Sequence, residues 1–102
     1  MKMYILVLDD VPNDFVPVIC AHSSLACFRK FEQDTDMQNW IENDFDKVVC
    51  KVNLKEFELA KQNHNKFVEL TESRLNNKVV SVAFCPTPEY HKCFKFFRMW
   101  KV

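Results

Sequence analysis

The sequence predicts a single α/β domain over residues 1–102, with a four-stranded mixed sheet and helices on both faces. Three observations predict this fold class. The chain length suits one hydrophobic core, and 48% of the 102 residues are hydrophobic, 10 Phe among them. Residues 3–8 are continuously apolar, as in a strand that is buried on both faces. Strand-like and helix-like patterns alternate along the rest of the chain, and capping and turn residues separate them.

The first half of the chain predicts a strand, two helices and a second strand. Residues 3–8 form the first strand. A helix is expected over about residues 16–31, because Pro17 suits the first turn of a helix. A short helix follows over about residues 36–43. Residues 47–52 are the second strand, and the connection between the two strands is expected to be right-handed, as in almost all βαβ units.

A capping box predicts the start of the next helix. Asn53 is the N-cap, and Glu56 stands three residues further on, where its carboxylate can accept from the backbone N–H of Asn53. Apolar residues then recur at helical spacing and define one inner face. The predicted members of this face are Phe57, Ala60, His64 and Phe67.

The second half of the chain predicts a hairpin and a final helix. Residues 67–71 and 79–84 are the two strands, and Asn76 and Asn77 make the turn, because asparagine tolerates positive φ. Thr87 is the expected N-cap of the final helix, with proline at its first position. Its predicted inner face holds Tyr90, Cys93 or Phe94, and Phe97.

Composition excludes several classes of site. The chain has no glycine, so the phosphate-binding P-loop, the GxGxxG turn and the GxSxG nucleophile elbow are absent in their usual forms. The 14 basic and 14 acidic residues balance, which argues against a polybasic membrane-binding segment. No apolar run approaches the roughly 18 residues that span a bilayer. Five cysteines without CxxC spacing predict reduced thiols and a cytoplasmic protein.

The pattern of histidine and cysteine does not predict a metal site. Cys20 and His22 lie two residues apart on a helix and therefore point about 200° away from each other, and no second pair supplies further ligands. Packing among small residues explains Cys20. His22 is interpreted either as a hydrogen-bonded, half-buried histidine or as a residue of a functional site.

The end of the chain interleaves aromatic and basic residues over positions 90–101. This pattern is typical of surfaces that stack on bases and pair with phosphates. The alternative is an amphipathic helix with its Phe residues in the core and its Lys residues in solvent, and we assign Phe94 and Phe97 to that core. The candidate ligand-binding residues of this segment are Lys95, Arg98, Trp100 and Lys101.

Four segments of the chain carry a resemblance to a known family. They are the apolar first strand, residues 20–23 (Cys-Ala-His-Ser), residues 47–49 (Lys-Val-Val) and residues 85–89 (Cys-Pro-Thr-Pro-Glu). In this order and spacing, the chain resembles the type 2 peptidyl-tRNA hydrolases, and most closely their divergent eukaryotic branch, the peptidyl-tRNA hydrolase domain-containing proteins. The resemblance implies the fold predicted above, a homodimer, and hydrolysis of the ester between peptide and tRNA without a metal or an organic cofactor.

The catalytic residues of that family are largely missing from this sequence. When His22 is aligned with the family histidine, Phe15 stands in place of the family's lysine and Ile19 in place of its glutamine. The family's Asp-Ala-Gly-x-Thr segment falls on residues 71–75, which contain neither aspartate nor glycine. A rebuilt site would use His22 as the base, with Arg74 stabilising charge. Its other candidate catalytic residues are Glu72, Thr71 and Ser73.

The sequence therefore leaves three functions open. The leading hypothesis is a catalytically degenerate relative of the hydrolases that binds tRNA or another nucleotide ligand, with Arg74 and the basic C-terminal residues as the ligand-binding groups. The second is an active hydrolase with the rebuilt site. The third is a module that binds a protein partner.

Overall fold

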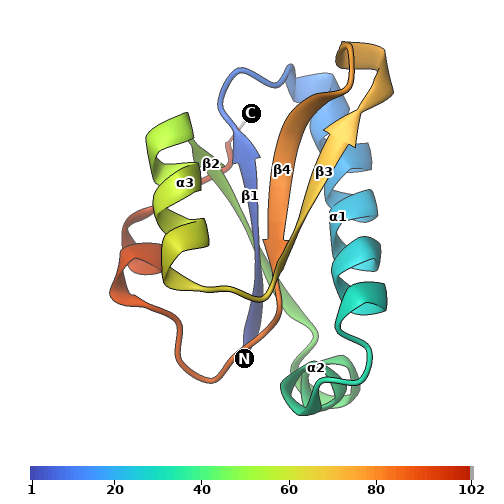
Figure 1. Ribbon diagram of the computed structural model, residues 1–102, viewed down its shortest axis with the longest axis vertical. Helices are drawn as coiled ribbons and strands as arrows, with labels where there is room; N and C mark the ends of the chain where they lie inside the picture. Colours follow the sequence, from blue (N-terminus) through green and yellow to red (C-terminus); the bar gives the residue numbers. More distant parts are fainter. Residues whose placement is uncertain (102) are drawn as a thin grey trace.

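A five-stranded mixed sheet organises the protein in the computed structural model, which describes residues 1–101 as one compact α/β domain (Figure 1). The strand order is β3-β4-β1-β2-β5, with β1 parallel to β2 and antiparallel to β4. The hairpin strands β3 and β4 are antiparallel, as are β2 and β5. The strands are β1 (Lys2–Leu8), β2 (Asp46–Val52), β3 (Phe67–Glu72), β4 (Lys78–Phe84) and β5 (Arg98–Met99).

The two long helices cover opposite faces of the sheet (Figure 1). Helix α1 (Val16–Lys30) packs against β3, β4 and β1, whereas α3 (Leu54–Asn63) packs against β1 and β2. A short helix α2 (Thr35–Asn39) continues into a π-helical turn, η2 (Trp40–Asp44), and together they match the short helix predicted there. The four predicted strands are confirmed to within one residue at each end, and helices cover both faces of the sheet as predicted.

Local signals in the sequence set the ends of these elements. The side chain of Asn53 accepts from the backbone N–H of Glu56 at 2.8 Å, and the Glu56 carboxylate accepts from the backbone N–H of Asn53 at 2.9 Å, so the predicted capping box is present. A short 3₁₀ turn, η3 (Ser73–Leu75), follows β3. Asn76 and Asn77 then take φ values of 56° and 57° between β3 and β4. The predicted asparagine turn is therefore confirmed.

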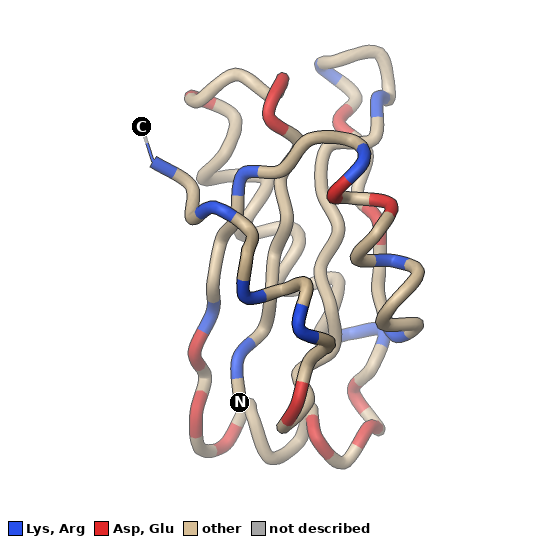
Figure 2. Tube along the Cα trace, turned by 90° about the vertical axis from the view of Figure 1, so that its left-hand side faces the viewer, with Lys and Arg blue, Asp and Glu red and all other residues tan. Residues whose placement is uncertain are grey.

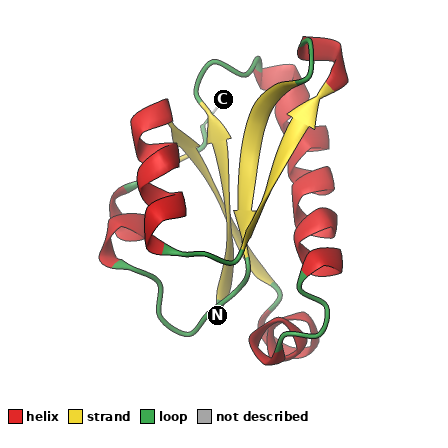
Figure 3. Cartoon of the chain, in the orientation of Figure 1, coloured by secondary structure: helices red, strands yellow, loops and turns green. Residues whose placement is uncertain are grey.

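The prediction of a final helix is wrong. Residues 85–91 run as a loop (Figure 3), and only a 3₁₀ turn, η4 (Lys92–Phe96), follows it. Pro86 and Pro88 supply no backbone N–H and push the residues before them out of the helical region. In addition, Thr87 forms an isolated antiparallel bridge with Lys2. The Tyr90 hydroxyl lies within 3.0 Å of main-chain carbonyl oxygens and fixes the end of the loop.

The chain ends in a strand that the sequence did not predict. Arg98 and Met99 pair with β2, and the backbone N–H of Trp100 donates to the carbonyl oxygen of Val49 at 2.9 Å. A strand of two residues is too short for alternation of side chains to reveal it. The sheet consequently has five strands rather than four.

The third helix is also shorter than its predicted inner face. Phe57 and Ala60 are buried as expected, but the helix ends at Asn63. His64 lies just beyond that end in extended backbone, and Phe67 begins β3. Both side chains still pack beside Phe84, with ring centroids 5.5 and 5.8 Å away. The helical spacing therefore identified inward-facing residues that in fact belong to three different segments.

Two buried hydroxyl groups join α1 to the sheet. Ser23 donates to the carbonyl oxygen of Ile19 at 2.7 Å, and its Oγ lies 2.8 Å from the Oγ of Ser81 on β4. Both serines are fully buried. Since the proton of Ser23 is directed to Ile19, Ser81 is the donor in the second hydrogen bond.

Replacing the acceptor, Ser23, is expected to lower the free energy of unfolding more than replacing the donor, Ser81. Ser23→Ala leaves the hydroxyl of Ser81 buried without a partner and lowers the free energy of unfolding by about 1–3 kcal/mol. Ser81→Ala leaves Ser23 bonded to Ile19 and costs less. Urea unfolding of the two single variants and the double variant measures the effect. The double variant is expected to lose less than the sum, and strictly additive losses contradict the assignment.

Candidate functional site

The predicted catalytic residues lie around the carboxyl end of β3, against α1. Glu72, the last residue of β3, is buried, and its carboxylate accepts from Arg74 twice: from Nη2 at 2.7 Å and from the backbone N–H at 3.1 Å. These hydrogen bonds lower the pKa of Glu72 to about 2, and the nearby charge of His22 contributes slightly. The guanidinium of Arg74 also lies 4.4 Å from the ring centroid of Phe15. The fold therefore brings together the positions that the alignment with the hydrolases singled out.

The arrangement does not form a catalytic chain of hydrogen bonds. His22 is exposed on α1, and among residues 1–101 its side chain has no hydrogen-bond partner. Thr71 and Ser73 are exposed as well. The carboxylate of Glu72 is ionised near pH 7, and it is bonded to Arg74 rather than to His22, the proposed base. A general base needs a partner that orients it, and Glu72 does not supply that contact.

The basic C-terminal residues form a different kind of surface. Lys51, Arg98, Met99 and Lys101 line a pocket of about 440 Å³ beside β5. The ammonium of Lys51 lies 5.0 Å from the ring centroid of Trp100, within the range of a cation–π contact. Three cations therefore surround this pocket, and no carboxylate lines it. Such a pocket suits a phosphate group.

The exposure of the aromatic rings in this segment differs from the sequence prediction, which made Trp100 a ligand-binding residue and did not include Phe96. Trp100 is half-buried against the core, and its Nε1 atom is buried without a hydrogen-bond partner within residues 1–101. Its ring is therefore not a free stacking surface. Phe96, which was not among the predicted site residues, is 79% exposed, and Met99 is 62% exposed. Pro86 and Pro88 were the signal in the sequence against a long helix here. Because the segment forms only the short turn η4, Phe96 lies outside the core.

The cations of this segment remain available for a ligand. Lys92, Lys95, Arg98 and Lys101 form no ion pair with any other residue of the described chain. They follow one another along the terminal segment across one face of the molecule (Figure 2). We call residues 92–101 the basic tail. An unpaired row of charges beside an exposed aromatic ring distinguishes it from the hairpin end, where Glu72 neutralises Arg74.

The cysteines are placed as reduced core thiols, apart from Cys20. Burial raises the pKa of Cys27 and Cys85 to about 12 and that of Cys50 to about 11. All three are buried, as is Cys93. Cys20, on α1, is half-buried, and burial raises its pKa too. None of the five has the lowered pKa of a nucleophile.

We expect a thiol reagent to distinguish Cys20 from the rest. At pH 8 the folded protein should react with Ellman's reagent fastest at Cys20, because the thiolate, not the thiol, attacks and the other sulfurs are inaccessible. Denatured protein should react at all five positions. Mass mapping of the first modified thiol checks this order, and Cys20→Ser is the control. Rapid modification of Cys27 or Cys85 in the folded state contradicts it.

The chain matches no protein-family model and no curated protein sequence. Within residues 1–101, no three His, Cys, Asp or Glu side chains are grouped closely enough to hold a metal ion. Of the helices in this part of the chain, none has the length and apolarity to cross a bilayer.

Proposed function

We propose that this protein is a catalytically degenerate relative of the type 2 peptidyl-tRNA hydrolases that binds RNA through its basic tail. One observation carries the proposal: four cations of the tail have no ion-pair partner among residues 1–101, and in the sequence they lie on both sides of Phe96, whose ring is exposed. Phosphate contacts from Lys and Arg supply most of the affinity for nucleic acid, and aromatic rings stack on unpaired bases. The 14 basic and 14 acidic residues of the whole chain balance, so the unpaired cations of the basic tail are a local feature and not part of a general positive charge.

The geometry near His22 supports the degenerate form of this hypothesis over the active one. Ester hydrolysis needs a base to activate water and a donor or cation for the developing oxyanion. Arg74 is the cation proposed for that task, but it is bonded to Glu72 at 2.7 Å and lies over the ring of Phe15. Removal of one such stabilising group typically costs about 10²–10³-fold in rate.

The RNA-binding proposal is tested by titrating labelled tRNA and following its fluorescence anisotropy. If the four tail cations each contact a phosphate, the logarithm of affinity should fall with the logarithm of salt with a slope of about −3. Affinity should then drop roughly fiftyfold between about 50 and 200 mM salt. Absence of binding even at the lower salt removes the proposal and leaves a protein partner as the function of the basic tail.

Hydrolase activity is tested separately with N-blocked aminoacyl-tRNA. Release of the blocked amino acid is expected at the rate seen in buffer alone, and His22→Ala should leave that rate unchanged. Turnover that His22→Ala abolishes would instead establish the rebuilt site and replace the degenerate interpretation. Sedimentation of the same sample measures whether the protein forms the homodimer that the resemblance implies.

A further inference from the structure

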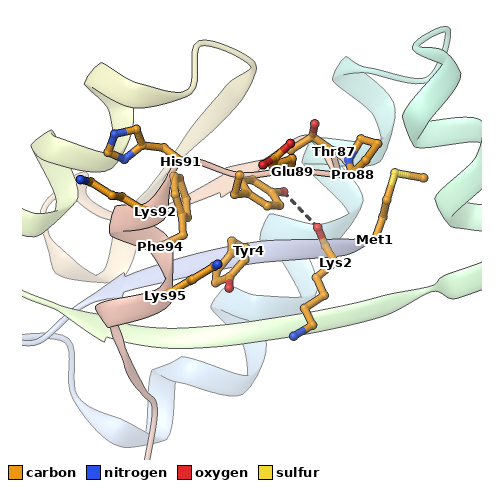
Figure 4. A pocket seen from close by; sticks show the side chains of 11 residues that line it. Met1, Lys2, Tyr4, Thr87, Pro88, Glu89, His91, Lys92, Phe94 and Lys95 are labelled. Carbon is orange, nitrogen blue, oxygen red and sulfur yellow. Dashed lines mark hydrogen bonds between the residues drawn. The ribbon is translucent and has the colours of Figure 1, made fainter.

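A second pocket lies at the other end of the basic tail, where the first residues of the chain lie beside the loop that follows β4. It has a volume of about 430 Å³ and is formed by the start of β1, the loop after β4 and the turn η4 (Figure 4). The bridge between Lys2 and Thr87 brings these segments together. This volume falls in the range of small-molecule sites in proteins. None of the residues proposed above for catalysis lines this pocket.

One wall of the pocket is a rigid aromatic cluster. The ring centroid of Tyr4 lies 4.8 Å from that of Tyr90 and 5.1 Å from that of Phe94. Tyr90 and Phe94 are themselves 4.8 Å apart. Phe94 is only 2% exposed, and the Tyr90 hydroxyl lies 3.0 Å from the carbonyl oxygen of Lys2. The half-buried rings of Tyr4 and Tyr90 are therefore held in place and can contact a flat ligand without further ordering.

The charged side chains that line the pocket are predominantly basic. Lys2, Lys92 and Lys95 line it and form no ion pair within the described part of the chain, against one carboxylate, that of Glu89. The N-terminal ammonium does not add to this charge, because it is paired with Asp44 at 2.6 Å. Three free cations beside two aromatic rings match a ligand with a phosphate and a planar ring.

We propose that this pocket is a nucleotide site, in which a base contacts Tyr4 and Tyr90 and its phosphate pairs with Lys92 and Lys95. The inference rests on the proposed RNA binding and makes it more specific. Lys95 lines this pocket and Arg98, three residues on, lines the next, so one strand can occupy both. A base that enters a pocket must be unpaired and unstacked. The ligand class is therefore single-stranded RNA rather than a duplex.

The pocket is tested first with small probes, by calorimetric titration of AMP, adenosine and inorganic phosphate. AMP is expected to bind at least about tenfold more tightly than either part alone, because stacking and phosphate pairing contribute together. Base protons of AMP should show ring-current shifts in its proton NMR spectrum. Equal affinity for phosphate and AMP means an anion site only, and equal affinity for adenosine and AMP means that the lysines do not bind phosphate. Either result overturns the proposal.

A double variant and a control variant at a distant lysine then link the pocket to RNA. The double variant Lys92→Gln/Lys95→Gln should lose AMP binding by about tenfold or more, while Lys55→Gln, an exposed lysine of α3 outside both pockets, should not change it. An adenosine decamer separates the two hypotheses. If the decamer binds but AMP does not, and the double variant binds the decamer like Lys55→Gln, the pocket is wrong and RNA binding is left to the other two cations of the basic tail, Arg98 and Lys101. If AMP binds and no RNA does, the RNA-binding function fails and the pocket remains a mononucleotide site.

Discussion

Replacing Phe84 with alanine is expected to lower the free energy of unfolding by about 3–5 kcal/mol. Phe84 ends β4 and is 0% exposed. Its ring centroid lies 5.0 Å from that of Phe94 and 5.5 Å from that of His64. Truncation would therefore open a cavity between the sheet, the end of α3 and the turn η4. Since small domains are stable by only about 5–15 kcal/mol, this single change removes a large part of the total.

Urea unfolding followed by circular dichroism measures the effect, and Phe96→Ala is the matched control. The same side chain is removed in both variants, but Phe96 is 79% exposed, so its loss should change the free energy of unfolding by less than about 0.5 kcal/mol. Similar losses for the two variants would show that the core is not where the fold places it. If Phe84→Ala does not fold at all, Phe84→Leu gives a smaller loss that can still be ranked against the control.

The sequence was enough to predict those elements whose structure depends on residues close together in the chain. The capping box of Asn53 and Glu56 and the turn at Asn76 and Asn77 act over four residues or fewer, so the pattern alone identifies them. The first strand was recognisable because it is central in the sheet and buried on both faces, which requires an unbroken apolar run. These elements are local consequences of the sequence.

The segment after β4 was mispredicted because distant contacts decide it. Tyr90, Phe94 and Phe97 fit a helical spacing, and Thr87 followed by proline fits a helix start. The competing interactions are the bridge from Thr87 to Lys2 and the hydrogen bonds of the Tyr90 hydroxyl, which join residues up to 88 positions apart. Periodicity carries no information on such pairs.

The same distinction applies to the candidate sites. The sequence identified Lys95, Arg98 and Lys101 from their composition, and they do line the two pockets. It could not predict the contribution of Lys2 or Lys51, because each lies on a different strand and reaches the tail only through the sheet. Nor could it show that Arg74 would be bonded to Glu72 at 2.7 Å and so be a poor phosphate ligand.

Removing two charges of the basic tail should weaken RNA binding without affecting the fold. Arg98→Gln/Lys101→Gln deletes two of the three cations around the 440 Å³ pocket and leaves Lys51 in place. Hydrogen bonds to charged groups contribute at least about 1.5 kcal/mol each, and about 1.4 kcal/mol is a factor of ten. Affinity for tRNA at low salt should therefore fall roughly a hundredfold. Both side chains are exposed, so the unfolding curve should not move.

The salt dependence of the same variant separates phosphate contacts from general positive charge. Loss of two phosphate contacts should reduce the slope of log affinity against log salt from about −3 to about −1.4. Lys55→Gln together with Lys66→Gln removes the same formal charge from other parts of the surface and should leave the slope near −3; Lys66 is already paired with Asp34. If both double variants reduce affinity equally, attraction by net charge explains the binding and the basic tail is not the RNA site. A tail-specific change in slope would instead show that phosphates contact Arg98 and Lys101 directly, because only contacts that release counterions contribute to that slope.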